Sequence, residues 1–374
     1  MISKNMKLKF LKLQNFRNHQ NFQHKFNKNI TVFYGSNAIG KTNIIEAIRF
    51  LSLPKSFRAK LDHELINWGY DFARAEGSFE KGKETTEVEI YLSKSKGQKK
   101  VIKINNNIRQ ISDLVGQFFI VLFCPEDLNL ISEAPSERRK YLNIVISQAD
   151  KRYYQEISEL KKILLNRNKL LFDIKERGSD PIMLEFWNEK LISLSKNIFR
   201  KRSYLINFIN KKLPIFVSQI GLRGKKLEIK YKSKLKKINL ENFEEEFRKQ
   251  LKEIQQDEIR RTRTLIGPHR DDFEILLDNK NVAYFASRGE TRGIILALKL
   301  TELSFSREIF KIKPILLLDD IFSELDFEHR RNIVKIARDQ QTIITTTELE
   351  LVGKDLVQEA EVVKINSDCP KTME

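Results

Sequence analysis

The feature of the sequence that most constrains its fold is a glycine-rich loop between an apolar run and an amphipathic run. The loop, Gly35-Ser-Asn-Ala-Ile-Gly-Lys-Thr42, matches the pattern G-x-x-x-x-G-K-[ST]. Residues 30–34 before it predict a central strand, and apolar residues recur at helical spacing from Ile44 to Leu51 after it. Loops in this context bind nucleotide phosphates. The sequence therefore predicts an α/β fold built around a phosphate-binding loop.

The loop also predicts how phosphate and metal are bound. Glycines allow the backbone N–H groups to face phosphate oxygens, and the following helix adds the positive end of its dipole. Lys41 can reach the β- and γ-phosphates and take part in catalysis, and the Thr42 hydroxyl can bind Mg²⁺. ATP and Mg²⁺ are the expected cofactors. The predicted nucleotide-binding residues of the loop are Gly35, Ser36, Asn37, Ala38, Ile39, Gly40, Lys41 and Thr42.

Two carboxylates follow a second apolar run. Residues 315–318 predict a buried strand, and Asp319 and Asp320 come directly after it. We expect Asp319 to hold Mg²⁺, directly or through water, and Asp320 to polarise the attacking water. An acidic turn at the end of a strand is common, so the catalytic interpretation depends on the phosphate-binding loop elsewhere in the chain.

The chain between these motifs is long enough to hold an inserted segment. Most of the sequence lies between Lys41 and Asp319, which is too much for a compact nucleotide kinase or a small GTPase. Residues 138–213 have helical spacing with a break near 178–181, and the α/β pattern returns after Gly267-Pro268. We expect an ATPase lobe, a helix-rich inserted lobe and a flexible tail, spanning respectively 1–130 with 260–365, 131–259 and 366–374.

The net charge of +18 is concentrated in the predicted inserted lobe. Residues 190–240 contain 15 Lys and Arg residues and a single acid, Glu228. Such a surface favours nucleic acid, because each neutralised phosphate releases condensed counterions. A solvated lysine-rich face and an anionic membrane surface are the alternatives. The candidate DNA contacts are Arg200, Lys201, Arg202, Lys234, Lys236 and Lys237.

Two further polar groups have competing interpretations. Arg138 and Arg139 are a second candidate for DNA binding, and pairing with Glu126, Asp127 or Glu137 is the structural alternative. Residues 269–272 (HRDD) have too few ligands at suitable spacing for a metal nuclease. We expect this second group to form a hinge or a contact between the lobes.

Two more motifs complete a set that has a known order. Ser287-Arg-Gly-Glu290 opens a predicted helix, which taken alone fits an ordinary N-cap better than an anion-binding helix start. Ser323-Glu-Leu-Asp326 follows the acidic strand. With the loop and the aspartate pair, they form the ordered motifs of ABC-type ATPases. The sequence resembles the RecF family of recombination and repair proteins, which are SMC-like ABC ATPases. Segments similar to that family are 13–18, 54–58, 125–131, 135–143, 164–168 and 267–272, with departures at Phe57, Glu133, Asn143 and Thr262.

The resemblance implies an ABC-type ATPase head, a mixed sheet with flanking helices, which carries the inserted helix-rich lobe. Ser287 and Gly289 of one subunit would bind the γ-phosphate held by Lys41 of the other, with Arg17 and Asn18 near the same nucleotide. ATP would thus join a homodimer, and weak, DNA-stimulated hydrolysis would release it. The expected ligand is double-stranded DNA, including its junctions with single strands, and the expected partners are RecR- and RecO-like proteins. The implied role is to assist recombinase loading in repair and replication restart.

Other classes of protein fit less well. Cys124 and Cys369 are too few for a disulfide framework or a zinc-finger array, and residues 118–124 are too short an apolar run to span a bilayer. We therefore expect a cytoplasmic, nucleoid-associated protein that does not bind membranes. The helical insertion disfavours a transporter subunit. An SMC-like scaffold and a nuclease-associated ATPase are the alternatives.

Overall fold

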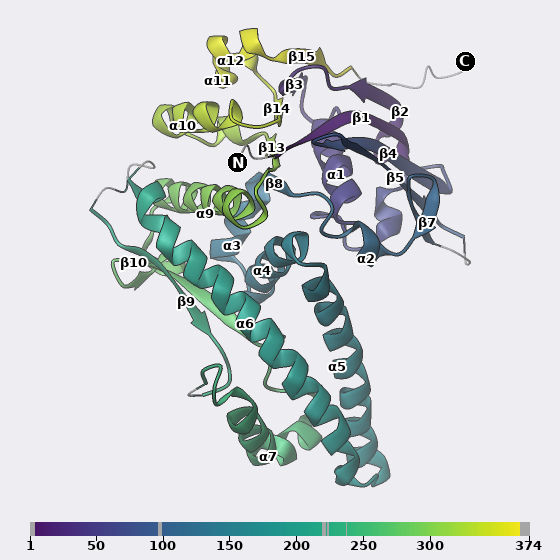
Figure 1. Cartoon of the computed structure of the whole chain (residues 1–374), viewed down its shortest axis with the longest axis vertical. Helices are drawn as coiled ribbons and strands as arrows, with labels where there is room; N and C mark the ends of the chain where they lie inside the picture. Colours follow the sequence, from purple (N-terminus) through teal and green to yellow (C-terminus); the bar gives the residue numbers. More distant parts are fainter. Residues whose placement is uncertain (1–3, 96–98, 219–221, 223, 237, 367–374) are drawn as a thin grey trace. The chain divides into compact units, whose positions relative to one another are not determined.

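The structure divides the chain into two compact units (Figure 1). It is a computed structural model that describes residues 4–95, 99–218, 222, 224–236 and 238–366. The candidate Lys237 and residues 367–374 of the predicted tail lie outside the described residues. Unit 1 comprises Met1–Leu128, Phe216–Arg223 and Arg292–Glu374, and unit 2 comprises Asn129–Ile215 and Gly224–Thr291.

Unit 1 contains a parallel sheet of five strands, in the order β15-β3-β14-β13-β8. Its three central strands are buried almost throughout, which is why the sequence shows them as continuous apolar runs. Because the strands are parallel, their carboxyl ends share one edge of the sheet. The strands are β3 (Ile30–Tyr34), β8 (Ile120–Phe123), β13 (Ile315–Asp319), β14 (Thr342–Thr346) and β15 (Glu361–Lys364).

The second sheet of unit 1 has seven strands and is mostly antiparallel. Its order is β12-β1-β4-β5-β6-β7, and β2 pairs with β1 beside this path. Alternate residues of β4 are buried, as expected where one face covers a core. The strands are β1 (Lys4–Phe16), β2 (His19–Lys25), β4 (Phe72–Lys81), β5 (Glu84–Ser93), β6 (Lys100–Ile104), β7 (Asn107–Arg109) and β12 (Ile312–Lys313).

One hydrophobic core joins both sheets of unit 1 to helix α1. It contains Ile44 and Ile48 of α1, Leu11 of β1 and Leu317 of β13, all fully buried. The helix that begins at the phosphate-binding loop therefore packs against both sheets. Besides the last two residues of α6 (Leu184–Val217), the helices with residues in this unit are α1 (Lys41–Ser52), η1 (Asp62–Leu65), α2 (Ile111–Leu114), η2 (Pro125–Leu128), α9 (Arg288–Phe310), η4 (Ile321–Ser323), α10 (Phe327–Ala337), α11 (Leu349–Val352) and α12 (Lys354–Glu359).

Unit 2 is built on a long helical hairpin, α5 and α6 (Figure 1). Gly178 caps α5 with a φ of 67°, at the predicted break, and Leu171 and Ile174 of α5 pack on Leu184 of α6. A three-stranded antiparallel sheet, β11-β10-β9, completes the unit. Its elements are α3 (Asn129–Ser132), α4 (Pro135–Ala149), α5 (Lys151–Arg177), η3 (Pro181–Met183), α6 (Leu184–Val217), β9 (Leu227–Lys232), α7 (Phe243–Arg261), β10 (Asp272–Leu277), β11 (Lys280–Asn281) and α8 (Val282–Phe285).

The predicted return of the chain to the ATPase lobe at residue 260 is wrong. Strand β9 pairs with β10 along its whole length, from Leu227 opposite Leu277 to Lys232 opposite Asp272. This pairing keeps β10 with the insertion, so unit 2 extends to Thr291 and the boundary falls within α9. The helix-rich insertion into an α/β unit is otherwise as expected.

Arg202 is a structural residue and not the predicted DNA contact. Its side chain is 1% exposed, and its guanidinium donates to the hydroxyls of Tyr153 and Tyr231, to Pro268 O at 2.7 Å and to Asn143 Oδ1 at 3.1 Å. Burial of this charged group is tolerated because each of its three nitrogens donates at least one hydrogen bond. The prediction from the basic run was wrong because a charge count does not reveal which face of α6 is buried.

None of the helices in the described part of the chain combines the length and apolar character of a bilayer-spanning helix.

Replacing Arg202 by Met should destabilise the chain strongly, because it leaves the Pro268 carbonyl and the Asn143 amide oxygen buried without this donor. We expect a loss of about 3 kcal/mol in the free energy of unfolding, measured by urea denaturation. Arg200→Met is the matched control, since Arg200 is exposed on the same helix, and it should cost less than about 0.5 kcal/mol. Equal losses in the two variants would contradict the buried role.

Candidate nucleotide-binding site

Glycine is required at two points of the phosphate-binding loop between β3 and α1. Gly40 caps α1 with a φ of 111°, and a Cβ there would lie 2.5 Å from Asn18 Oδ1 and 2.6 Å from His19 Nε2. A Cβ on Gly35 would lie 2.8 Å from the Ile365 carbonyl oxygen. The path of the loop is thus set by close backbone approach, as the motif requires.

The Lys41 ammonium lies within this loop. Its Nζ donates to the carbonyl oxygens of Gly35 and Ser36, at 2.8 Å each, and the residue is 6% exposed. Burial lowers the pKa of Lys41, while the charges of Asp320 and Asp319 act in the opposite direction. At the start of α1, the N–H groups of Asn43 and Ile44 donate to Gly40 O at 3.0 and 3.2 Å, and the positive end of the helix dipole lies beside the Lys41 ammonium.

Asp319 connects the loop helix to the edge of the parallel sheet. Its Oδ1 accepts from the Thr42 hydroxyl at 3.0 Å and from the Thr345 hydroxyl at 2.6 Å. Asp319 and Thr345 are register partners in β13 and β14. Burial raises the pKa of Asp319, and the two hydroxyl donors lower it in part. Thr345 is therefore the threonine of 345–347 that contacts this group, since Thr346 donates to Glu348 O.

Asp320 leaves one carboxylate oxygen available. Its backbone has a φ of 50°, and its N–H is held by Thr345 O and by Thr345 Oγ1 at 3.1 Å. Its Oδ1 is buried and has no hydrogen-bond partner among the described residues. Burial raises the pKa of Asp320, Lys41 opposes this rise and Glu324 adds to it. A buried acceptor without a partner is unusual, and a bound water or polar ligand would satisfy it.

These groups fit a nucleoside triphosphate with Mg²⁺. Thr42 and Asp319 supply a hydroxyl and a carboxylate oxygen within 3.0 Å of each other, which are ligand types that Mg²⁺ takes beside phosphates. Lys41 and the start of α1 supply positive charge next to them. The predicted cluster of Lys41, Thr42, Asp319 and Asp320 is thus brought together in unit 1.

Arg17 and Asn18 reach the same loop in different ways. Asn18 Oδ1 accepts from Asn43 Nδ2 at 2.7 Å, next to the loop. Arg17 instead binds Glu46 of α1 through two bonds of 2.8 and 2.9 Å, and Glu64 O at 3.0 Å. Glu46, which the sequence analysis missed, is fully buried and also accepts from Ser56. The structure makes Arg17 a connection between β1 and α1, and its predicted nucleotide contact stays a prediction.

Ser287 and Gly289 belong to unit 2, at the start of α9. The Ser287 N–H donates to Glu290 Oε2 at 2.8 Å, and the Glu290 N–H donates to Ser287 Oγ at 3.2 Å. These reciprocal bonds form a capping box. Gly289 is exposed, and beyond its chain neighbours and its own helix backbone no atom of the described residues lies within 4 Å of the position of a Cβ. Their predicted contact with a nucleotide on a second subunit stays a prediction.

A buried cluster of charges in unit 1 was not predicted. The Lys299 ammonium on α9 donates to Leu122 O at 2.6 Å and pairs with Asp127 at 2.7 Å. Glu302, one turn further along α9, lies 3.9 Å from that ammonium, and Arg49 of α1 adds a second buried cation. Burial raises the pKa of Glu302 to about 7, although both cations oppose this rise. The cluster holds α9 to the end of β8 and to η2.

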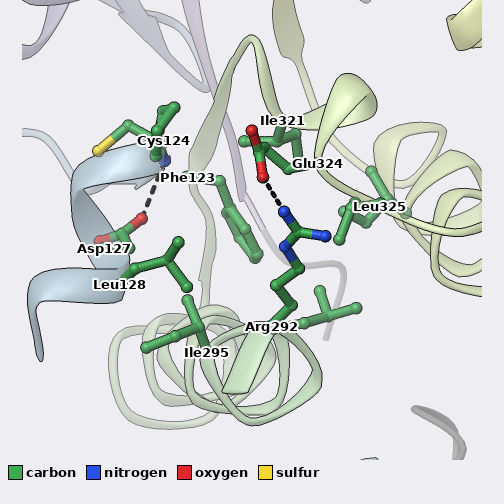
Figure 2. A pocket seen from close by; sticks show the side chains of 12 residues that line it. Phe123, Cys124, Asp127, Leu128, Arg292, Ile295, Ile321, Glu324 and Leu325 are labelled. Carbon is green, nitrogen blue, oxygen red and sulfur yellow. Dashed lines mark hydrogen bonds and ion pairs between the residues drawn. The ribbon is translucent and has the colours of Figure 1, made fainter. Parts of the chain in front are cut away.

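An apolar pocket lies beside this cluster (Figure 2). Phe123, Leu128, Ile295 and Leu325 are among the residues that line it. At one side, Arg292 of α9 pairs with Glu324 in the Ser-Glu-Leu-Asp segment. Since Glu324 also raises the pKa of Asp320, this ion pair reduces an unfavourable charge near the predicted catalytic acid.

The remaining DNA candidates differ in exposure. Arg200, Lys234 and Lys236 are exposed. Lys201 is mostly buried and pairs with Asp150 at 2.8 Å and with Glu156 at 2.9 Å. Other lysines of the basic window also bind acids, as in the pairs Lys196–Glu244, Lys225–Glu290, Lys226–Glu228 and Lys232–Glu274. The freely exposed charge is therefore smaller than the sequence count indicates.

Arg138 and residues 269–272 form contacts within unit 2. Arg138 pairs with Asp272 through bonds of 2.7 and 3.0 Å, and not with any of the acids predicted for it. Asp271 accepts from Tyr231 and Ser233, at 2.6 and 2.9 Å. Burial lowers the pKa of His269 to about 4. These partners make the segment part of the internal structure of unit 2.

Comparison with known proteins gives consistent matches over the whole chain. A family model described as RecF/RecN/SMC N terminal domain matches residues 7–368. The DNA replication and repair protein RecF of an Exiguobacterium species is 38% identical over 366 residues, covering 96% of this chain and 97% of that protein. A solved structure of the recombination mediator protein RecF with ATPrS, in the RecFOR pathway, has a TM-score of 0.88 at 33% identity and covers 98% of both chains. A RecF–ATP structure has a TM-score of 0.86 at 35% identity and covers 92% of each.

The buried Glu302 should make stability depend on pH near neutrality. Its pKa is about 7 when folded against an ordinary value of 4.5, so between these values the folded chain binds a proton that the unfolded chain lacks. The free energy of unfolding should therefore fall by about 3 kcal/mol as pH rises from 4.5 through 7. Urea titrations at several pH values should show this fall in the wild type and not in Glu302→Gln.

Glu350→Gln is the control for this measurement, because Glu350 is exposed. The control should follow the wild-type pH profile. A Glu302→Gln profile parallel to that of the wild type would show that Glu302 does not titrate in this range.

Proposed function

Because this chain belongs to the RecF family of DNA replication and repair proteins, we propose that it binds ATP and Mg²⁺ at its phosphate-binding loop and forms an ATP-dependent dimer that holds double-stranded DNA. The supporting observation is the convergence of Lys41, Thr42, Asp319 and Asp320 in unit 1. The RecF proteins whose structures match this chain were solved with ATP or ATPrS.

Each residue of the site has a separate task in ATP hydrolysis. Lys41 and the start of α1 bind the β- and γ-phosphates and stabilise their charge. Thr42 and Asp319 hold Mg²⁺, which supplies additional positive charge at the phosphates when it is bound. Asp320 directs its unpartnered oxygen at the attacking water and orients it. Thr345 positions both aspartates: its hydroxyl donates to the Asp319 carboxylate and accepts from the backbone N–H of Asp320.

The dimer follows from linkage between ATP and subunit association. Ser287 and Gly289 of one subunit contact the γ-phosphate bound by Lys41 of the other, so ATP stabilises the dimer by its affinity for the joined state. Loss of the γ-phosphate removes that interaction. Slow hydrolysis, stimulated by DNA, therefore sets how long the dimer remains on DNA.

The DNA surface lies on unit 2, at its exposed basic residues. Arg200, Lys234 and Lys236 are exposed and have no acidic partner among the described residues. Contacts with phosphates give affinity with little sequence specificity. RecR- and RecO-like proteins act with the dimer at junctions of single- and double-stranded DNA, where it assists recombinase loading. This role places the protein at the nucleoid.

Replacing Asp320 by Asn should slow ATP hydrolysis by about a hundredfold, because the amide no longer acts as a base for the attacking water. ATP binding should persist, so light scattering should show a long-lived dimer with ATP and Mg²⁺. Lys41→Ala is the comparison variant, which should not form the dimer because it lacks the ammonium that binds the phosphates. Normal turnover in Asp320→Asn would reject the assignment of Asp320.

Reversing three exposed charges should weaken DNA binding. In Arg200→Glu/Lys234→Glu/Lys236→Glu, the salt slope of DNA affinity should fall by about 1 for each DNA phosphate that the variant no longer binds. The matched control reverses Lys161, Lys162 and Lys169, which are exposed on α5 of the same unit. Fluorescence anisotropy with labelled DNA at several salt concentrations measures the affinity and the salt slope of each triple variant. The surface is wrongly placed if the two triple variants behave alike.

A further inference from the structure

Glu290 places a negative charge at the start of α9, beside the two residues proposed to meet a nucleotide. Its carboxylate accepts from the Ser287 N–H, three residues earlier. The hydrogen bond from Lys225 and that from the Ser287 backbone hold the pKa of Glu290 at about 2. Glu290 is therefore ionised at any pH at which the protein would work. A helix start that carries such a charge is less favourable for an anion than one without it.

Lys225 pairs with this carboxylate from a different part of unit 2. It lies just before β9, and the Lys225 ammonium donates to Glu290 Oε1. The backbone beside it is fixed, since the Lys226 N–H donates to Asp278 Oδ1 at 2.8 Å and the Asp278 N–H donates to Lys226 O at 2.9 Å. Asp278 directly follows β10. The sheet of unit 2 thus holds Lys225 next to the start of α9.

A triphosphate approaching Ser287 and Gly289 would be repelled by an unpaired Glu290. Charges a few ångströms apart interact appreciably even near a protein surface. Protonation would not relieve this repulsion, because a glutamate carboxyl with an ordinary pKa is already ionised at neutral pH. A cation bound to the carboxylate offsets this repulsion, and Lys225 occupies that position.

We propose that Lys225 neutralises Glu290 so that the start of α9 accepts the γ-phosphate of a nucleotide held by a second copy of this chain. Lys225 acts through Glu290 and is therefore a positioning residue, which controls dimer formation and leaves nucleotide binding by a single subunit unchanged. The inference rests on the proposed ATP-dependent dimer and deepens it by assigning the charge balance of its second half-site.

If Lys225 acts by neutralising Glu290, removing the Glu290 charge should not impair dimerisation; if the ion pair only supports the structure, removing either partner should impair it. Three variants distinguish these two explanations. Lys225→Met leaves Glu290 unpaired and should raise the protein concentration needed for the ATP-dependent dimer by about tenfold, or about threefold for each of two sites. Glu290→Gln removes the repulsion while its amide oxygen can still accept from Ser287, so it should dimerise at least as well as the wild type. The double variant Lys225→Met/Glu290→Gln should dimerise as Glu290→Gln does.

Lys226→Met is the matched control. Lys226 carries the same charge one residue away, is more exposed and pairs with Glu228 instead of α9. Light scattering with ATP and Mg²⁺ gives the dimerisation midpoint, and a fluorescent ATP analogue at dilute protein gives the affinity of the single subunit. The affinity of the single subunit for the ATP analogue should be the same in all variants. The difference in dimerisation midpoint between Lys225→Met and the wild type should become smaller at high salt.

The proposal is overturned if Lys225→Met dimerises like the wild type, or if Lys226→Met is equally impaired. It is also overturned if Glu290→Gln is as weak as Lys225→Met, because the pair would then matter only as a structural contact. A wild-type chain that stays monomeric with ATP and Mg²⁺ would instead reject the proposed dimer itself, so the two failures are distinguishable.

Discussion

The nucleotide site depends on one carboxylate oxygen that two hydroxyls share. Asp319 Oδ1 accepts from Thr42 of the loop helix and from Thr345 of the neighbouring strand. Thr42 is far from Asp319 and Thr345 in the sequence, and the parallel order of β3, β14 and β13 brings the ends of these strands to one edge. The position of α1 is thereby fixed against the sheet at the point where phosphate and metal would bind. Asp320, the next residue, is positioned by the same threonine, because its backbone N–H donates to the Thr345 hydroxyl.

Around this point the chain uses buried charge to join elements that must keep their relative places. Glu46 of α1 binds Arg17 at the end of β1, and Lys299 of α9 binds Asp127 and the end of β8. Glu46 and Lys299 are buried, and each is paired with a half-buried partner, as the large desolvation penalty of a lone charge requires. Breaking one partner would leave the other charge uncompensated, so these contacts favour one arrangement of the helices over alternatives.

The sequence was most informative where local pattern and chemistry coincide. The loop at 35–42, the strand before it and the aspartates after residue 318 are each recognised from neighbouring residues, and the structure places them together. The return of the chain at Arg292 could not be predicted in this way, because it depends on β9 pairing with β10 across α7. For the same reason Arg202 was misassigned: its burial is set by Tyr153, Tyr231 and Pro268, which no local pattern connects to it. Glu46 escaped notice because an acid on a helix usually faces water.

The position in the chain at which unit 2 is inserted affects how related proteins can differ from one another. The insertion begins after β8, which is an edge strand of the parallel sheet and, within the described residues, pairs only with β13. A segment added there interrupts no hydrogen bond between strands of that sheet. Changes in the length or charge of the inserted segment would therefore leave the nucleotide-binding site of unit 1 intact. Related proteins can share this site and carry second units of very different size.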